Sequence, residues 1–151
     1  MNKVIEKADR SSAVAAYNNA LAQLTQLPLA MSAIERHKAV ASGLTVEAYG
    51  LLAAKGIGKL VLDRIVKPRT LDHRKAKGEH LSPSESDSLF RVAHITALAE
   101  ATFGDEAKAM RWLNKPKRRF DGMTPLDMVS TSQGASLVEE MLYQVQEGFA
   151  A

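Results

Sequence analysis

The pattern of apolar and polar positions along this chain is typical of an all-helical protein. Alanine, leucine and other strong helix formers dominate, and long stretches in which Val, Ile or Thr alternate with polar residues are missing. Glycine and proline fall at intervals that suit the ends of helices. The predicted fold class is therefore all-α.

Capping signals place the ends of the predicted helices. The clearest is Ser82-Pro83-Ser84-Glu85, in which Ser82 and Glu85 can form a capping box and Pro83 sits where no backbone donor is needed. The polar segment 1–12 is expected to be disordered. Helices are predicted over residues 13–27, 32–42, 46–55, 58–66, 68–77, 83–103, 107–113 and 133–147, and a short one begins at Thr124-Pro125.

The last predicted helix has a clear apolar face. At 100° per residue, five apolar side chains fall on one side of it: Leu137, Val138, Met141, Leu142 and Val145. We interpret this face as a core or dimer contact and not as a cofactor site.

Length and composition restrict the class of protein. The 151 residues include no cysteine, which excludes thiol catalysis, disulfides and thiolate metal sites. Nothing approaches the apolar run of about 20 residues that a membrane span needs. A cytoplasmic protein without a membrane partner is expected.

The net charge of +3 is unevenly distributed. Residues 55–79 hold eight Lys or Arg against three acidic residues, and a second basic cluster spans residues 111–119. Residues 120–151 hold five acidic residues and no Lys or Arg. Such segregation indicates separate partners for the middle and for the end of the chain.

The predicted helix 68–77 has the layout of a DNA-recognition helix. One face carries hydrogen-bond donors and positive charges, and Leu71 points the opposite way, where it can anchor the helix. With the preceding short helix and the turn at Val66-Lys67 it forms a helix-turn-helix. The alternative is an ordinary solvated cationic helix. The predicted DNA-binding residues are Arg69, Thr70, His73, Arg74 and Lys77.

Signals for catalysis are weak. His37, His73, His80 and His94 lie far apart, without a carboxylate at metal-ligand spacing on a shared helix face, and are interpreted as structural or surface residues. No glycine-rich phosphate loop follows a strand. We therefore predict no enzymatic activity, no catalytic residue, no metal and no cofactor. The basic run 115–119 is interpreted first as structural and second as a binding loop.

Two stretches carry a resemblance to a known family. They are Arg111-Trp112-Leu113-Asn114-Lys115-Pro116 and the segment 120–129, FDGMTPLDMV, followed by Gly134. This pattern resembles the toxin-binding domain of Xre/MbcA/ParS-type antitoxins. Upstream, PRTLDHRK at 68–75 and LSPSESDSLFR at 81–91 resemble the Xre-like helix-turn-helix region of the same antitoxins.

The resemblance implies a type II toxin-antitoxin system. Its architecture would be an Xre-like DNA-binding region at 13–80, a connecting helix at 81–104 and a toxin-binding domain at 105–151. The partner would be a RES-domain toxin that degrades NAD⁺, and the antitoxin would cover its active site and repress its own operon. A homodimer and a higher-order toxin-antitoxin complex are expected.

The segment expected to bind the toxin is the acidic, amphipathic end together with the basic loop before it. Its predicted residues are Trp112, Lys115, Arg118, Arg119, Glu140, Tyr143, Glu147, Phe149, Ala150 and Ala151. The alternative function is a stand-alone dimeric helix-turn-helix transcriptional regulator whose C-terminal region only dimerises.

Overall fold

The computed structural model describes the backbone of residues 2–148 and the side chains of residues 10–148. Over this range it is all-helical, as predicted, and contains no strand. The helices are α1 Asn2–Thr25, α2 Ala33–Ser42, α3 Val46–Lys55, α4 Lys59–Ile65, α5 Pro68–Lys77, α6 Pro83–Phe103, α7 Glu106–Leu113, α8 Pro125–Met128 and α9 Ser132–Gln146, with a 3₁₀ turn η1 at Arg118–Phe120. None of the described helices combines the length and apolar content needed to cross a bilayer.

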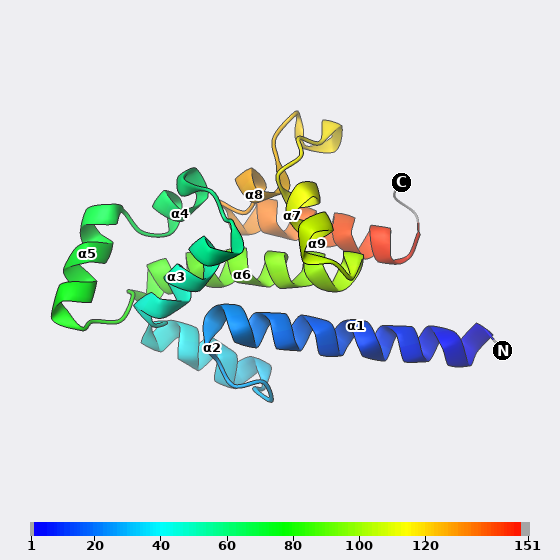
Figure 1. The fold of residues 1–151 in the computed structure, drawn as a ribbon, viewed down its shortest axis with the longest axis horizontal. Helices are drawn as coiled ribbons and strands as arrows, with labels where there is room; N and C mark the ends of the chain where they lie inside the picture. The colour runs from blue at the N-terminus through cyan, green and yellow to red at the C-terminus, as the bar shows by residue number, and fades with distance from the viewer. Residues whose placement is uncertain (1, 149–151) are drawn as a thin grey trace.

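Helix α6 lies at the centre of the molecule, and α1, α2, α4, α7 and α9 pack around it (Figure 1). Its start is fixed by the predicted capping box, in which Ser82 Oγ accepts from Glu85 N and Glu85 Oε1 accepts from Ser82 N. Side chains on several sides of α6, among them Leu89, Ile95 and Ala97, are fully buried. The helix expected to be a connector is thus also the main core element.

Helix α1 differs from the expectation at its start. The segment 1–12 was expected to be disordered, yet α1 begins at Asn2, and Met1 lies outside the described residues. The sequence MNKVIEKADR has no proline or glycine to interrupt a helix. Ala20, Leu21 and Leu24 anchor the second half of α1 in the core, while its first half extends beyond the body of the molecule (Figure 1).

The C-terminal helices meet at one very close contact. A Cβ on Gly134 would lie 1.8 Å from the carbonyl oxygen of Met128, so only glycine allows α9 to start against α8. Thr124 and Asp127 form a capping box at the start of α8, and Thr131 caps α9. The Thr-Pro and Gly positions of the C-terminal motif therefore set the angle between these two short segments.

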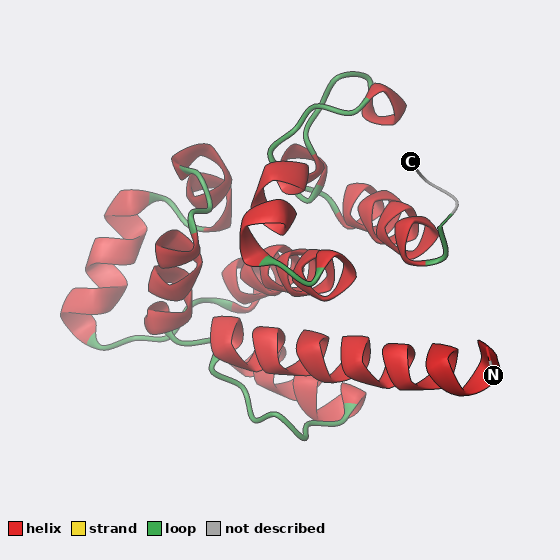
Figure 2. Ribbon diagram, turned by 45° about the vertical axis from the view of Figure 1, so that its right-hand side comes forward, coloured by secondary structure: helices red, strands yellow, loops and turns green. Residues whose placement is uncertain are grey.

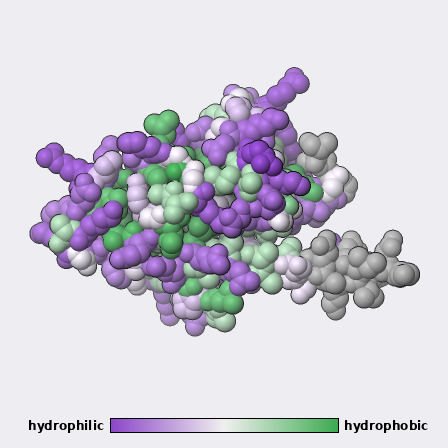
Figure 3. All heavy atoms as spheres, viewed as in Figure 1, coloured by the Kyte–Doolittle hydropathy of each residue, from purple (hydrophilic) through white to green (hydrophobic). Residues whose placement is uncertain are grey.

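The two ends of the molecule are formed by different helices. Helix α5 lies at one end, and the start of α1 and the end of α9 lie at the other (Figure 1). Figure 2 shows that loops separate α5 from the rest of the bundle on both sides. Hydrophilic side chains cover the surface over α5, whereas apolar side chains gather in the middle of the same view (Figure 3).

Candidate functional site

Helix α5 presents most of its predicted DNA-binding residues to solvent. Arg69, Thr70, His73 and Lys77 are exposed, while Leu71 is buried and anchors the helix. Pro68 occupies the first turn, and Gly78 ends the helix in the left-handed conformation. The exposed face offers a guanidinium, an ammonium and a hydroxyl, which are the groups that contact phosphates and base edges.

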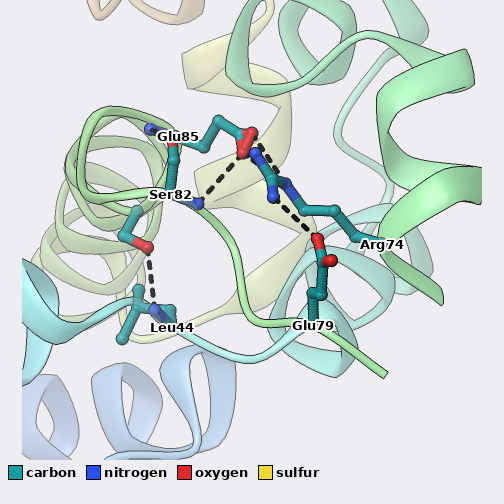
Figure 4. Close-up of polar contacts among 6 residues, drawn as sticks. Leu44, Arg74, Glu79, Ser82 and Glu85 are labelled. Carbon is teal, nitrogen blue, oxygen red and sulfur yellow. Dashed lines mark hydrogen bonds and ion pairs between the residues drawn. The ribbon is translucent and has the colours of Figure 1, made fainter. Parts of the chain in front are cut away.

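Arg74, the fifth predicted DNA-binding residue, is instead engaged within the protein. Its Nε lies 2.7 Å from Glu85 Oε1, and its Nη1 lies 3.3 Å from Glu79 Oε2 (Figure 4). Partial burial alone would raise the pKa of Glu85, but hydrogen bonds from Ser82 and Arg74 outweigh it and lower that pKa. The guanidinium therefore holds α5 against the first turn of α6.

A second set of polar contacts joins the loops beside α5. Leu44 N donates to Ser86 Oγ at 2.7 Å, and Leu81 N donates to Leu44 O at 2.9 Å. His80 Nδ1 lies 3.0 Å from Gly43 O. Gly43 has φ +102, and a Cβ there would meet Leu81 O at 2.4 Å, so glycine is required for this close approach.

The basic loop that follows α7 is structured by the tryptophan. The Trp112 ring lies 5.7 Å from that of Phe103, and Lys117 Nζ lies 4.6 Å from the Trp112 ring centroid. Burial, with Lys115 nearby, lowers the pKa of Lys117. Trp112 is thus half-buried and supports the loop through Lys117.

The same loop still exposes positive charge. Lys115, Arg118 and Arg119 are exposed, and Arg119 Nη1 donates to Gln144 Oε1 on α9 at 2.7 Å. This bond brings the basic loop and the acidic last helix side by side, although they are 25 residues apart. Charges of both signs therefore lie next to one another on the C-terminal surface.

Helix α9 buries one face and presents the other. Of the predicted apolar face, Val138, Met141 and Leu142 are buried and Val145 is half-buried, but Leu137 is 49% exposed. Leu137 lies at one edge of the apolar stripe.

The exposed face of α9 carries three of the residues expected to bind the toxin: Glu140, Tyr143 and Glu147. Phe149, Ala150 and Ala151 lie outside the described residues.

Sequence reasoning missed a hydrogen-bonded chain that joins three helices. His94 Nδ1 lies 2.6 Å from the Tyr17 hydroxyl of α1, and His94 Nε2 lies 3.2 Å from Glu139 Oε1 of α9. Tyr143 donates to the same carboxylate oxygen at 3.3 Å. The signal in the sequence was one histidine on a largely apolar helix, and its partners are 77 and 45 residues away.

Ion pairs tie α3 and α4 to the central helix and to the C-terminal helices. Lys55, the last residue of α3, lies 2.9 Å from both Glu100 of α6 and Glu106 of α7. Burial alone would lower the pKa of Lys55, but contacts with Glu106 and Glu100 raise it overall. Burial raises the pKa of Glu100. Arg64 of α4 also lies 3.5 Å from Asp127 of α8.

Within the part of the chain that the structure describes, no group of three or more His, Asp or Glu side chains is arranged to hold a metal ion. The exposed cationic face of α5 and the mixed-charge surface of the C-terminal helices are therefore the two candidate sites, and both suit the binding of macromolecules.

One comparison with known proteins concerns the C-terminal helices. Residues 98–148 match the family described as the antitoxin Xre/MbcA/ParS C-terminal toxin-binding domain. This range comprises the end of α6 and all of α7, α8 and α9.

Three curated proteins are similar over longer stretches. Antitoxin Xre of Pseudomonas putida is 44% identical over 134 residues, which cover 88% of this chain and 84% of that protein. A Sphingobium protein named Prs ADP-ribosylating antitoxin is 26% identical over 60% of this chain and 63% of its own length. Antitoxin Xre of Yersinia enterocolitica is 25% identical over 55% of this chain and 57% of its own length.

Proposed function

Because this chain belongs to the Xre/MbcA/ParS family of antitoxins, we propose that it neutralises a RES-domain toxin and represses its own operon by binding DNA. An antitoxin of this family has a cognate toxin. In this proposal the toxin degrades NAD⁺, and the antitoxin covers its active site.

The surface of α7–α9 is our proposed contact with the toxin. It lies within the matched residues 98–148 and carries Lys115, Arg118, Glu140 and Tyr143 on its exposed side. Exposed carboxylates on α9 suit a basic cleft of the kind that binds a phosphate-containing substrate. We propose that Phe149, Ala150 and Ala151, which follow Gly148 in the sequence, enter that cleft.

The exposed face of α5 is our proposed contact with operator DNA. Helix α4, the turn at Val66-Lys67 and α5 have the order of a helix-turn-helix, with Arg69, Thr70, His73 and Lys77 on the outer side. We expect a homodimer, because operator palindromy mirrors two-fold protein symmetry. In this proposal Arg74 contributes by holding α5 in place.

The proposal rests mainly on one observation: the proposed DNA contact and the proposed toxin contact are far apart on the molecule. Helix α5 and the end of α9 lie at opposite ends of the molecule (Figure 1), so neither partner needs to displace the other. One chain is therefore suited to bind DNA and toxin together, as an autoregulating antitoxin must.

The proposal can be tested by separating the two activities with exposed-residue variants. The protein is co-expressed with the product of the neighbouring gene, and growth, cellular NAD⁺ and operator binding are measured. We expect Arg69→Ala with Lys77→Ala to lose operator binding and keep growth rescue. We expect Glu140→Arg with Glu147→Arg to lose rescue and keep operator binding.

The alternative, a stand-alone dimeric regulator, predicts a different result. No variant and not even the unsubstituted protein would then rescue growth, and no protein would co-purify in a stoichiometric amount. Growth rescue without any change in cellular NAD⁺ would retain the antitoxin and reject the RES-type partner.

A further inference from the structure

A groove opens between the middle of α1, the second half of α6 and the end of α9. It encloses about 800 Å³. Ala13, Val14 and Tyr17 of α1 line one side, and Tyr143 and Gln146 of α9 line the other. Figure 2 shows α1 and α9 on either side of α6 at this end of the molecule.

Hydrogen bonds fix the width of this groove. On one side, Tyr17 reaches His94 of α6 at 2.6 Å, and His94 reaches Glu139 of α9 at 3.2 Å. Farther along, Gln146 Nε2 donates to Thr102 Oγ1 at 2.7 Å. Both walls are thereby bonded to the same central helix, so the groove is formed before any partner arrives, which lowers the entropic cost of binding.

The chemistry of the lining selects the kind of occupant. Its floor carries Leu98 and Ala101, and Val14 on the α1 wall is 59% exposed. The polar groups beside them are three hydroxyls, the Gln146 amide and the His94 imidazole, and one basic and one acidic residue, Arg10 and Glu147, complete the lining. A nucleic acid would require an excess of positive charge that this lining lacks. The groove fits an uncharged, amphipathic polypeptide segment.

The position of the groove indicates which polypeptide would occupy it. Apart from His94, its floor and its α9 wall, from Leu98 to Glu147, fall inside the residues 98–148 that match the toxin-binding domain. Its other wall is α1, which lies outside that domain. We propose that the cognate toxin inserts a largely uncharged, amphipathic segment between α1 and α9, so that α1 supplies the second half of the toxin-binding surface. This inference rests on the proposed function.

A charge placed on the α1 wall tests the proposal. Val14→Glu puts a carboxylate into the groove, and Ser12→Glu puts the same charge on an exposed position about 160° around α1, away from the lining. The dissociation constant for the purified product of the neighbouring gene is measured by titration calorimetry. We expect Val14→Glu to weaken binding at least tenfold, because the apolar contact of Val14 is lost and the new carboxylate is desolvated when the segment covers it. We expect Ser12→Glu to leave binding unchanged.

The outcomes that would overturn the inference are distinct from failure of the proposed function. If the unsubstituted protein does not bind the neighbouring gene product, the proposed partner is wrong and the inference falls with it. If it binds and Val14→Glu binds equally well, or if both variants lose affinity alike, the groove is not the docking site. A Val14→Glu variant that only lowers the protein's own mass in sedimentation would assign the groove to a second copy of the chain.

Discussion

Helices α5 and α9 present the two candidate surfaces, and they are attached to the molecule in different ways. Helix α5 has one buried residue, Leu71, in ten positions, and polar contacts from Arg74 to Glu85 and Glu79 hold it. Helix α9 has five buried residues in fifteen positions: Gly134, Ala135, Val138, Met141 and Leu142. Helix α5 is therefore held by polar contacts and one leucine, and helix α9 by the core.

This difference has an energetic consequence. Burial of a leucine side chain is worth about 2 kcal/mol relative to exposure, and a hydrogen bond to a charged group is worth about 1.5–3 kcal/mol. The several buried residues of α9 therefore outweigh Leu71 and the part-buried pair of Arg74 and Glu85 together. Helix α9 should open only with the whole core, while α5 should open locally at a lower free energy. The most informative experiments change one anchor at a time and compare the two helices.

The largest loss of unfolding free energy is expected from Leu142→Ala. Leu142 is fully buried, so the variant should lose about 4 kcal/mol of unfolding free energy through lost transfer energy and a residual cavity. The matched Leu71→Ala should cost about 2 kcal/mol, and hydrogen exchange should show it mainly as faster exchange in α5. Equal, global losses for both leucines in denaturant titration and exchange would mean that the two helices open as one unit.

A smaller loss is expected from Gly134→Ala. The new Cβ would clash with the Met128 carbonyl, so α9 must shift away from α8, at a cost of about 2 kcal/mol in denaturant titration. Gly50→Ala in α3 is the control, because nothing lies within 4 Å of a Cβ there. It should stabilise the protein by up to about 1 kcal/mol, since alanine favours a helix over glycine. Stabilisation by both substitutions would refute the close contact.

The helix boundaries could be predicted from sequence because the signals that set them are local. Ser82 with Glu85, Thr124 with Pro125, and Gly78 after a basic last turn each act within four residues. Several predicted helices, among them Pro83–Phe103, have the observed bounds. The start of α1 was not predicted because residues 1–12 are largely polar, as disordered termini often are, and only their helix propensity indicates a helix there.

The site residues could be predicted only in part because their contacts are tertiary. The angular count placed Arg74 on the outer face of α5, but the position of Glu85 beside it follows from how α5 folds back onto α6. The same holds for His94, whose partners Tyr17 and Glu139 come from two other helices. Leu137 belongs to the apolar stripe by periodicity, and its exposure depends on how α9 packs.

Acidification should loosen α5 before it affects α9. The pKa of Glu85 is lowered in the folded protein, so the stabilisation from this carboxylate is present above its unfolded value of about 4.3 and is lost as the pH falls through the lowered pKa. Exchange in α5 should therefore accelerate at acidic pH relative to α9. Glu85→Gln keeps the capping geometry but removes the charge, so this acceleration should shrink. An unchanged pH profile in that variant would assign the effect to other carboxylates.

The smallest effect on stability and the most specific effect on function are expected from Arg69→Ala. Arg69 is exposed on α5, so the free energy of unfolding should change by less than about 0.5 kcal/mol. If its guanidinium contacts a phosphate, the slope of log affinity for operator DNA against log salt should become shallower by about 0.9.

Arg74→Ala should weaken operator binding through a loosened α5, with accelerated hydrogen exchange in that helix. A full change of slope for Arg74→Ala without any change in exchange would show that Arg74 contacts the DNA itself, and the distinction drawn between the two arginines would then be wrong.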